Sequence, residues 1–331
     1  MSIYDIARET GYSPATVARA LNGKGYCSVK AKNIIRETAS RLDYKPNLTA
    51  KELRSSRTNR ILLCIPDICN PFYFRIIQSC SRVLEESGYY VMLCATEKSL
   101  KKELQMIDLL DQKYCDGVIL ISFDFNASNV GAIRATKRPV VLGNRYADQR
   151  KDDNFDYVYV DHIKGMELAT EHLLARGCRH IALVTGDVRL QTTCERLQGF
   201  KNALAAAGGA YDGRYVVNGN YDTEHSKAAF GGLLSAGLPV DGVIASNDLA
   251  AFGILRCCAE RGVRVPQDIK LVSFDNTDYA VMSSPTLTSV DMCQEQLGEN
   301  LARSLLSRID GRGAVENVLL SPTLVERESS R

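Results

Sequence analysis

Residues 3–23 read IYDIARETGYSPATVARALNG, and this stretch decides the fold expected at the N-terminus. A helix-turn-helix needs a small residue in its first helix, a residue that tolerates positive φ in the turn and an apolar residue in its second helix, because the two helices cross closely. Ala7, Gly11 and Val17 occupy these three places. The stretch therefore predicts a helix-turn-helix whose second helix begins at Pro14.

Three helices are expected between residues 2 and 43, because a capping residue stands at the start of each. Ser2 has Asp5 three residues later, which is a capping pattern. Ser13 precedes Pro14, a residue that suits the first helical position, and Ser28 precedes the third helix. One further helix is expected over residues 47–53; it is too short to be stable alone.

The second helix is the candidate DNA-reading element, since such a helix enters the major groove with its N-terminal residues at the base edges. Arg19 is the natural reader, because a guanidinium pairs with guanine through two hydrogen bonds. Tyr4, Ser13 and Thr16 carry hydroxyls suited to phosphate, and the methyl group of Ala15 suits a thymine methyl. A helical hairpin with exposed polar side chains is the alternative interpretation of the same residues.

Charge is distributed unevenly along the chain. Residues 1–60 contain twelve Lys and Arg and five Asp and Glu, a net charge of +7. Because the whole chain carries +2, the remaining residues carry −5. A small basic module on a mildly acidic body indicates a polyanionic partner for the first part only.

The composition excludes several classes of protein. With 45% hydrophobic and 24% charged residues the chain can bury a full core. It has no apolar run long enough to span a membrane. The first ten residues include Asp5, Arg8 and Glu9 and do not resemble a signal peptide, so we expect a cytoplasmic protein without a membrane partner.

Neither metal nor catalytic chemistry is expected. The eleven cysteines are scattered without a CxxC pair, and the four histidines do not stand at zinc-ligand spacings near them, so reduced thiols and no structural metal are predicted. The chain has no GxSxG elbow, no phosphate-binding GxxxxGK[ST] loop and no GxGxxG fingerprint. We therefore expect a protein that is not an enzyme, with no catalytic residues and no cofactor.

After residue 60 the pattern changes to an alternation of strands and helices, which is typical of parallel sheets covered by helices. About ten strands in some 270 residues favour two lobes over a single sheet. The expected strands are residues 61–65, 89–94, 117–121, 139–142, 157–160, 180–184, 214–217, 242–245 and 269–273.

Polar segments follow several of these strands, at the ends where α/β lobes bind ligands. They are residues 67–73, 143–145, 246–248 and 274–276, with Tyr221 after a further strand and Arg196 in a helix. A sugar site needs aromatic faces, which Phe72 and Tyr221 could supply. It also needs planar polar groups for paired hydroxyls, which Asn144, Arg145, Arg196, Asn247 and Asp275 could supply. The alternative is that these are structural loop residues, as Asp248 is expected to be at the start of its helix.

The opening stretch, with LDYKPN at residues 42–47 and with Ala50 and Leu53, resembles the headpiece of the lactose-repressor (LacI) family. The resemblance covers essentially the whole chain. It implies an α/β protein with an N-terminal all-α helix-turn-helix headpiece and a two-lobed, periplasmic-binding-protein-like core with parallel sheets. The implied parts are a headpiece (1–45), a hinge helix and linker (46–58) and an effector-binding and dimerisation domain (59–331). The N-lobe would comprise about 59–160 plus 291–317 and the C-lobe about 161–290 plus 318–329.

The resemblance also implies a function. The chain would be a homodimeric regulator, a repressor of carbohydrate-metabolism genes, that binds a palindromic double-stranded operator and responds to a small sugar or sugar derivative. The hinge helix would form only on DNA, with Leu53 as a wedge in the minor groove. The implied DNA contacts are Tyr4, Ser13, Pro14, Ala15, Thr16, Arg19, Asn22, Asn47, Ala50 and Leu53. The implied effector contacts are Phe72, Tyr73, Asn144, Arg145, Arg196, Tyr221, Asn247 and Asp275.

Several residues depart from the family pattern. Ala18 stands where serine is usual, Ala31 where a phosphate-binding threonine is common, and Pro14 cannot read a base by hydrogen bonding. Asn144 replaces a frequent aspartate, which with Arg145 leaves an acidic sugar open as the effector. A cytoplasmic or exported solute-binding protein, and a regulator controlled by a protein partner, remain the alternatives. Whether the effector releases DNA or strengthens its binding stays open.

Overall fold

The computed structural model describes residues 2–22, 25–44, 57–122, 125–146, 148–150 and 153–331. The chain divides into two compact units, residues 1–58 and residues 59–331, and each is considered by itself. The helix expected over residues 47–53, with Asn47, Ala50 and Leu53, lies outside the described residues.

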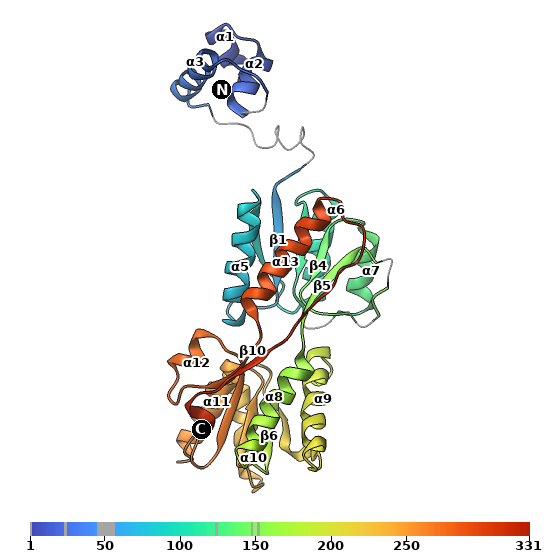
Figure 1. The fold of residues 1–331 in the computed structure, drawn as a ribbon, viewed down its shortest axis with the longest axis vertical. Helices are drawn as coiled ribbons and strands as arrows, with labels where there is room; N and C mark the ends of the chain where they lie inside the picture. The colour runs from blue at the N-terminus through green and yellow to red at the C-terminus, as the bar shows by residue number, and fades with distance from the viewer. Residues whose placement is uncertain (1, 23–24, 45–56, 123–124, 147, 151–152) are drawn as a thin grey trace. The chain divides into compact units, whose positions relative to one another are not determined.

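The first unit contains three described helices, α1 (Ile3–Thr10), α2 (Pro14–Asn22) and α3 (Val29–Arg41) (Figure 1). Their starts are capped as expected. The Asp5 carboxylate accepts the Ser2 amide at 2.8 Å, the Ser13 hydroxyl accepts the Thr16 amide at 3.2 Å, and the Ser28 hydroxyl accepts the Ala31 amide at 3.3 Å. The predicted three-helix headpiece is therefore confirmed, with each helix within two residues of its expected start.

The turn between α1 and α2 depends on Gly11. Its φ is +72°, a conformation that residues other than glycine rarely adopt. Its amide donates to the Ala7 carbonyl at 3.0 Å. The core beneath the turn consists of the buried side chains of Ile6, Ala7, Val17, Ala20, Ala31, Ile35 and Ala39. The three residues that predicted the helix-turn-helix thus lie at the crossing of its helices.

The first lobe of the second unit is built on a six-stranded sheet in the order β11-β5-β4-β3-β1-β2, whose recorded pairs are all parallel. Its strands are β1 (Arg60–Ile65), β2 (Tyr90–Ala95), β3 (Gly117–Leu120), β4 (Val140–Leu142), β5 (Phe155–Val160) and β11 (Val318–Leu320). Two helices cover each face: α5 (Phe72–Glu86) and α13 (Gln294–Ile309) on one, α6 (Leu100–Asp111) and α7 (Ala127–Ala135) on the other.

The second lobe repeats this plan with the strand order β12-β10-β9-β8-β6-β7, in which only the recorded β10–β12 pair is antiparallel. Its strands are β6 (Ile181–Thr185), β7 (Val216–Asn218), β8 (Gly242–Ala245), β9 (Lys270–Asp275), β10 (Thr288–Asp291) and β12 (Thr323–Val325). The helices are α8 (His162–Ala175) and α9 (Gln191–Ala206) on one face and α10 (Thr223–Ser235) and α11 (Asp248–Glu260) on the other, with the short elements α12 (Asp278–Met282), η1 (Gly213–Tyr215) and η2 (Glu328–Ser330).

The chain passes between the lobes from β5 to α8, from β10 to α13 and from β11 to β12 (Figure 1). Hydrogen bonds tie these crossovers together. The Asp161 amide donates to the Leu320 carbonyl at 3.0 Å, and the Cys293 thiol donates to the Ser321 carbonyl at 3.2 Å. The three crossovers therefore form a joined hinge.

The expected lobe boundary near the C-terminus needs one correction. The family resemblance implies that residues 318–320 belong to the C-lobe, but they form β11, which pairs with β5 in the sheet of the first lobe. The physical reason is that this three-residue strand completes the edge of the first sheet before the chain crosses to β12. The apolar pattern of the sequence does not predict the strands β10, β11 and β12.

None of the described helices is both long and apolar enough to cross a bilayer. All eleven cysteines lie in described segments, and each is a free thiol.

Candidate functional site

The start of α2 presents a solvent-facing surface, the reading face, formed by Ser13, Pro14, Ala15 and Arg19. The Ser13 and Thr16 hydroxyls lie 2.9 Å apart and the Arg19 Nε donates to the Ala15 carbonyl at 3.3 Å. Among the described residues, these groups therefore bond only at their own helix. Such bonds exchange readily for bonds to a ligand, and the Pro14 ring offers only van der Waals contact.

Tyr4 and Asn22 complete the described part of the expected DNA contacts. The Tyr4 side chain is 71% exposed on α1, and Asn22 is the last residue of α2. Ala31, where a phosphate-binding threonine was considered, is buried in the headpiece core, so its position faces inward.

The basic residues of the headpiece differ in how they are paired. Arg41 forms an ion pair with Glu9 at 2.6 Å, and Arg8 lies 4.0 Å from Asp5. Arg19, Lys30 and Arg36 are exposed and have no ion pair within the part of the chain that the structure describes. Cations without protein partners are the groups that release counterions when a phosphate backbone binds.

A cavity opens between the two lobes of the second unit, with about 670 Å³ of empty space that is partly open to solvent. Seven of the eight expected effector contacts line it, and they come from both lobes: Phe72, Tyr73 and Asn144 from the first, and Arg196, Tyr221, Asn247 and Asp275 from the second. The other lining residues are Asn70, Ile121, Ser122, Gly143, Val160, His162, Thr192, Ser246, Met292 and Leu297. The wall thus combines the aromatic rings of Phe72, Tyr73 and Tyr221 with polar groups on an apolar background.

Arg196 is the fixed cation of this cavity. Its Nη1 donates to the Ser246 carbonyl at 2.5 Å and its Nε to His162 Nδ1 at 3.4 Å, while its guanidinium carbon lies 4.5 Å from the centre of the Phe274 ring. It is buried and forms no salt bridge within the described residues. These contacts leave Nη2 for a ligand and hold the guanidinium in one orientation before the ligand arrives.

His162 begins α8 and is held neutral by its surroundings. Removal from water, with the positive charges of Arg196 and Arg145, lowers its pKa well below the ordinary value. Because Nδ1 accepts from Arg196, the ring proton belongs on Nε2. The ring therefore offers the cavity an N–H donor and no charge.

Asp275 ends β9 and supplies the carboxyl group of the cavity. Burial raises its pKa to about 8, the nearby Asp248 adds to the rise and Arg196 opposes it. The side chain is therefore largely protonated at neutral pH in the unliganded protein. A ligand with hydroxyl groups could accept a hydrogen bond from the protonated form or donate to the ionised one.

Three aromatic side chains flank these groups. Phe72 meets the Tyr73 ring edge-on, with centroids 5.1 Å apart, and burial raises the pKa of Tyr73. The Tyr221 hydroxyl lies 2.8 Å from the Thr193 hydroxyl. Gly186 leaves room for the Tyr221 ring, since a Cβ atom there would lie only 1.9 Å from the ring. The glycine is thus required for the placement of an aromatic wall.

Asn247 and Asn144 line the cavity, but their side-chain oxygens already accept hydrogen bonds from the protein. The Asn247 oxygen caps α11 by accepting the Ala250 amide at 2.8 Å, and its nitrogen donates to the Tyr221 carbonyl at 3.1 Å. The Asn144 oxygen accepts the Arg145 amide at 2.9 Å. The helix cap expected near Asp248 is therefore Asn247, while Asp248 is buried and accepts bonds from Ser273, Ser289 and Thr277.

Arg145 does not belong to the cavity wall. Its guanidinium pairs with the buried Glu195 at 2.7 Å and stacks 5.1 Å from the centre of the Tyr159 ring. Because this charge is already neutralised by a carboxylate, it gives no support to an acidic sugar in the cavity.

The sequence does not predict three further polar lining residues, His162, Thr192 and Ser122. The hydroxyls of Thr192 and Ser246 are buried and have no hydrogen-bond partner among the described residues. Buried hydroxyls without partners are costly, so they indicate a place where a ligand or water binds. His162 lies just beyond a strand end and Thr192 one helical turn before Arg196, so both could have been found by the rule that found the others.

No group of three or more His, Cys, Asp or Glu side chains is placed to hold a metal ion within the described ranges. What the cavity offers is hydrogen bonding and stacking on a preformed wall, which suits a polar ligand with an apolar face.

Comparison with known proteins matches both units. Residues 2–47 match the model of bacterial regulatory proteins of the lacI family, and residues 170–330 match a periplasmic binding protein-like domain. The chain is 31% identical to the HTH-type transcriptional regulator DegA of Bacillus subtilis over 99% of its length and 98% of the relative's. It is 32% identical to the ribose operon repressor of Halalkalibacterium halodurans, over 100% of its length and 97% of the relative's.

Among solved structures, the chain resembles the complex of a transcriptional regulator, CelR, with cellobiose. The TM-score is 0.77 at 29% sequence identity, and the match covers 100% of both chains.

Proposed function

Because this chain belongs to the lacI family of bacterial regulatory proteins, we propose that it is an operator-binding repressor controlled by a sugar or sugar derivative in the interlobe cavity. The cavity carries this proposal, since its wall combines a preoriented Arg196, a buried Asp275 and aromatic rings. Planar polar groups beside aromatic faces match a ring with hydroxyls on its edge and C–H groups on its face. The relatives named for ribose and cellobiose support the same ligand class.

Six residues are proposed to contact the effector most directly: Phe72, Tyr73, His162, Arg196, Tyr221 and Asp275. Asn144 and Asn247 are assigned a secondary role because protein groups already use their oxygens. The neutralised Arg145 favours an uncharged sugar over an acidic one.

The DNA-binding part of the proposal assigns two headpieces of a homodimer to the halves of an inverted repeat. Arg19 is the base reader, and Tyr4, Ser13, Pro14, Ala15, Thr16 and Asn22 supply the surrounding contacts. The hinge residues Asn47, Ala50 and Leu53 are proposed to complete the interface, with Leu53 in the minor groove. The protein would act in the cytoplasm, where operator DNA lies, and as a regulator with no catalytic step.

The proposed mechanism links the two sites through the lobes. An effector that contacts residues of both lobes stabilises their closure, and closure shifts the first lobes, to which the headpieces connect. Coupling of this kind typically changes DNA affinity by about 1–3 kcal/mol.

A thermal-shift screen tests the ligand proposal. The panel holds ribose, cellobiose, sugar acids and sugar phosphates, and Asp275→Ala serves as the matched control. A ligand at about 100 times its dissociation constant adds about 2.7 kcal/mol of stability to the wild type. The assignment of this cavity to a sugar is contradicted if the stabilisation persists in Asp275→Ala, or if no sugar raises the unfolding temperature of the wild type.

A further inference from the structure

The turn that carries Asp275 into the cavity has an unusual backbone. Asp275 and Asn276 are consecutive and both have positive φ, of +99° and +53°. Residues other than glycine rarely adopt this region. Two consecutive non-glycine residues with positive φ therefore persist only where surrounding contacts hold them. The position of the Asp275 carboxyl therefore depends on the groups that hold this turn.

Four side chains hold the turn from different elements. The Asn276 amide donates to the Ser289 hydroxyl at 2.9 Å, and the Asn276 side-chain nitrogen donates to Asp291 at 2.7 Å. The Gln294 side chain donates to the Asp275 carbonyl. The fourth is Arg327, whose Nη2 donates to the Asn276 side-chain oxygen at 2.6 Å. The first three come from β10 and α13, whereas Arg327 comes from the C-terminal segment.

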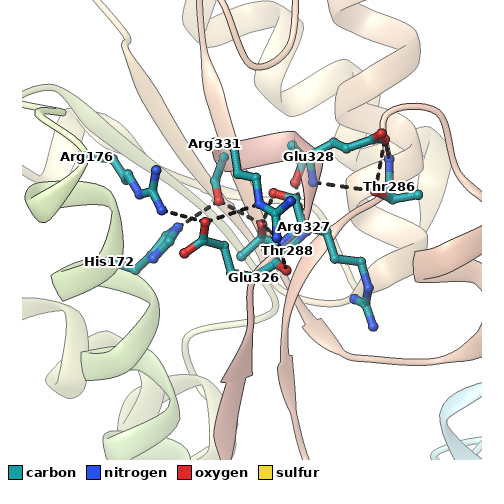
Figure 2. A network of polar contacts seen from close by, with 10 residues as sticks. His172, Arg176, Thr286, Thr288, Glu326, Arg327, Glu328 and Arg331 are labelled. Atoms are coloured by element: carbon teal, nitrogen blue, oxygen red, sulfur yellow. Dashed lines mark hydrogen bonds and ion pairs between the residues drawn. The ribbon is translucent and has the colours of Figure 1, made fainter.

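Arg327 bridges two parts of the second lobe with one guanidinium. While Nη2 reaches Asn276, Nη1 donates to the Leu287 carbonyl at 2.6 Å. Its amide donates to the Thr288 hydroxyl at 2.8 Å. Figure 2 shows the Arg327 guanidinium pointing away from the cluster of Arg176, Glu326 and Arg331.

The segment around Arg327 is itself fixed. Ser329 and Ser330 are fully buried; the Ser329 hydroxyl donates to the Leu271 carbonyl at 2.7 Å, and the Ser330 hydroxyl lies 2.7 Å from His172 Nε2. Arg176 pairs with Glu326 at 2.5 Å (Figure 2). Arg327 therefore extends from a rigid base, so its guanidinium can position the turn.

The turn is also linked to the hinge. Asp291, which accepts from Asn276 through one oxygen, accepts the Cys293 amide through the other at 2.8 Å. Cys293 lies at the crossover from β10 to α13 and bonds to the Ser321 carbonyl of another crossover. A continuous path of hydrogen bonds thus runs from Arg327 through Asn276 and Asp291 to the joined hinge.

We propose that Arg327 is a positioning residue, which holds the Asp275–Asn276 turn so that the Asp275 carboxyl faces the cavity and ties that turn to the hinge. The inference rests on the proposed function of the cavity for its biological meaning. Its structural content, the dependence of the turn on a forked contact from the C-terminal segment, stands without any ligand.

The forked contact explains why an arginine serves here. A guanidinium presents donors in a fixed planar fork, whereas a lysine ammonium is a single point on a flexible stem. Lysine keeps the charge but cannot reach Leu287 and Asn276 with the same geometry. Arg327→Lys therefore removes the bridge without removing the positive charge.

Hydrogen exchange of the full-length protein without ligand tests the proposal. In Arg327→Lys, amides over residues 275–278 exchange about tenfold faster than in the wild type, while those of α10 keep their rates. Arg331→Lys is the matched control, because within the described residues the hydrogen bonds of the Arg331 side chain go to Glu326 alone. The control is expected to leave residues 275–278 unchanged. An unchanged rate in Arg327→Lys, a uniform rise across the lobe, or the same local rise in the control overturns the proposal.

A second readout distinguishes positioning from general support. A loosened turn admits water to Asp275, so its pKa moves back towards the ordinary value, and the fall in unfolding temperature between pH 4 and pH 8 becomes smaller in Arg327→Lys. The titratable groups around Asp275 are Asp248, Arg196 and Tyr73, with His162 and Tyr221 on the same cavity wall, and all are unchanged in the variant. An unaltered pH profile contradicts the proposal.

Asn276→Gly covers the case in which Arg327→Lys does not fold. Glycine adopts the positive φ without strain but lacks the side chain that joins Arg327 to Asp291. Faster exchange at residues 275–278 is expected, and no change overturns the proposal. These tests use no effector. If residues 275–278 exchange faster in the variants but no sugar stabilises the wild type, the proposed function is refuted and the role of Arg327 is not.

Discussion

In the part of the chain that the structure describes, the polar side chains of the reading face lie in solvent and bond only at their own helix. Most of those in the interlobe cavity are buried and held by other elements. Arg19 makes one long bond to the carbonyl four residues before it. Arg196 is held by a carbonyl, an imidazole and an aromatic ring. Both are arginines on a helix, Arg19 in the last turn of α2 and Arg196 in the first half of α9, yet only Arg196 has a fixed orientation.

The difference follows from the partner each site receives. The phosphate backbone of DNA has a high charge density and its groove is rigid, so binding to DNA can order an exposed arginine. A small polar molecule makes few contacts, so the protein must hold most of the cavity's side chains in place before the ligand binds. Substitutions on the reading face should therefore change DNA binding and spare stability, and substitutions in the cavity should change both stability and ligand response.

The largest expected effect concerns the carboxyl group of the cavity. Since the folded-state pKa of Asp275 is raised to about 8, the folded protein binds a proton that the unfolded chain has lost between about pH 4 and pH 8. Its free energy of unfolding therefore falls as the pH rises through this window. Asp275→Asn removes this contribution, which is on the order of 5 kcal/mol. The difference in free energy of unfolding between pH 4.5 and pH 8 is measured by urea unfolding, which resolves differences of roughly 1 kcal/mol.

Asp187→Asn is the control for this comparison. Asp187 is bonded to Arg189, which lowers its pKa to about 2, so its contribution has the opposite sign and is lost as the pH falls towards that value. Parallel pH profiles of Asp275→Asn and the wild type would break the claim that the cavity carboxyl is protonated by burial.

The next effect concerns the reading face. Arg19→Ala should weaken binding to a selected operator by about 1–3 kcal/mol in each half-site, because a two-pronged contact to guanine is lost. The melting temperature should not change, since Arg19 is exposed. Fluorescence anisotropy with selected and random DNA at one salt concentration measures the difference. Arg8→Ala, the exposed arginine of α1, should affect both DNAs alike; equal losses for Arg19→Ala on both DNAs would contradict base reading.

A smaller effect concerns the aromatic wall. A methyl group at Gly186 would overlap the Tyr221 ring, so Gly186→Ala displaces the ring and costs about 1–3 kcal/mol of stability. Effector binding, measured by calorimetry, should be lost with it. Gly232→Ala in α10 meets open space and should instead stabilise the protein by about 0.5–1 kcal/mol. Full effector binding by Gly186→Ala would show that the Tyr221 ring is not part of the site.

The smallest expected effect on effector binding concerns Arg145, which lies just outside the cavity wall. Arg145→Ala leaves the Glu195 carboxylate without its cation and costs about 1–2 kcal/mol of stability. Because Arg145 lies off the cavity wall, effector affinity should change less than about twofold, a difference under 0.5 kcal/mol. A loss of affinity in Arg145→Ala comparable to that in Arg196→Ala would place Arg145 in the site after all.

Much of this arrangement could be predicted from local patterns. The headpiece follows from Ala7, Gly11 and Val17, because helix caps and a left-handed turn depend on neighbours in sequence. Nine of the strands coincide with short apolar runs in the sequence, and the rule that ligands bind at strand ends identifies six of the seven expected contacts that line the cavity. The seventh, Arg196, lies in a helix. These signals are local or repeat along the chain.

The remaining features depend on contacts between distant segments. Nothing near Arg145 in sequence reveals that Glu195 neutralises it, and the role of Arg327 requires the C-terminal segment to lie against β10. The strand β11 pairs with β5, which is far from it in the sequence, so no local pattern reveals that it belongs to the first sheet. Tertiary pairing decides each of these cases, and local propensity does not.

The central claim is that a sugar in the interlobe cavity controls DNA binding. It is tested most directly by measuring the affinity of a selected operator with and without each sugar of the panel, in the wild type and in Asp275→Ala. One class of sugar should change the wild-type dissociation constant by about 5- to 150-fold, a coupling of about 1–3 kcal/mol, and leave the variant unchanged. An operator affinity that no sugar alters, or that changes equally in both proteins, would contradict the account.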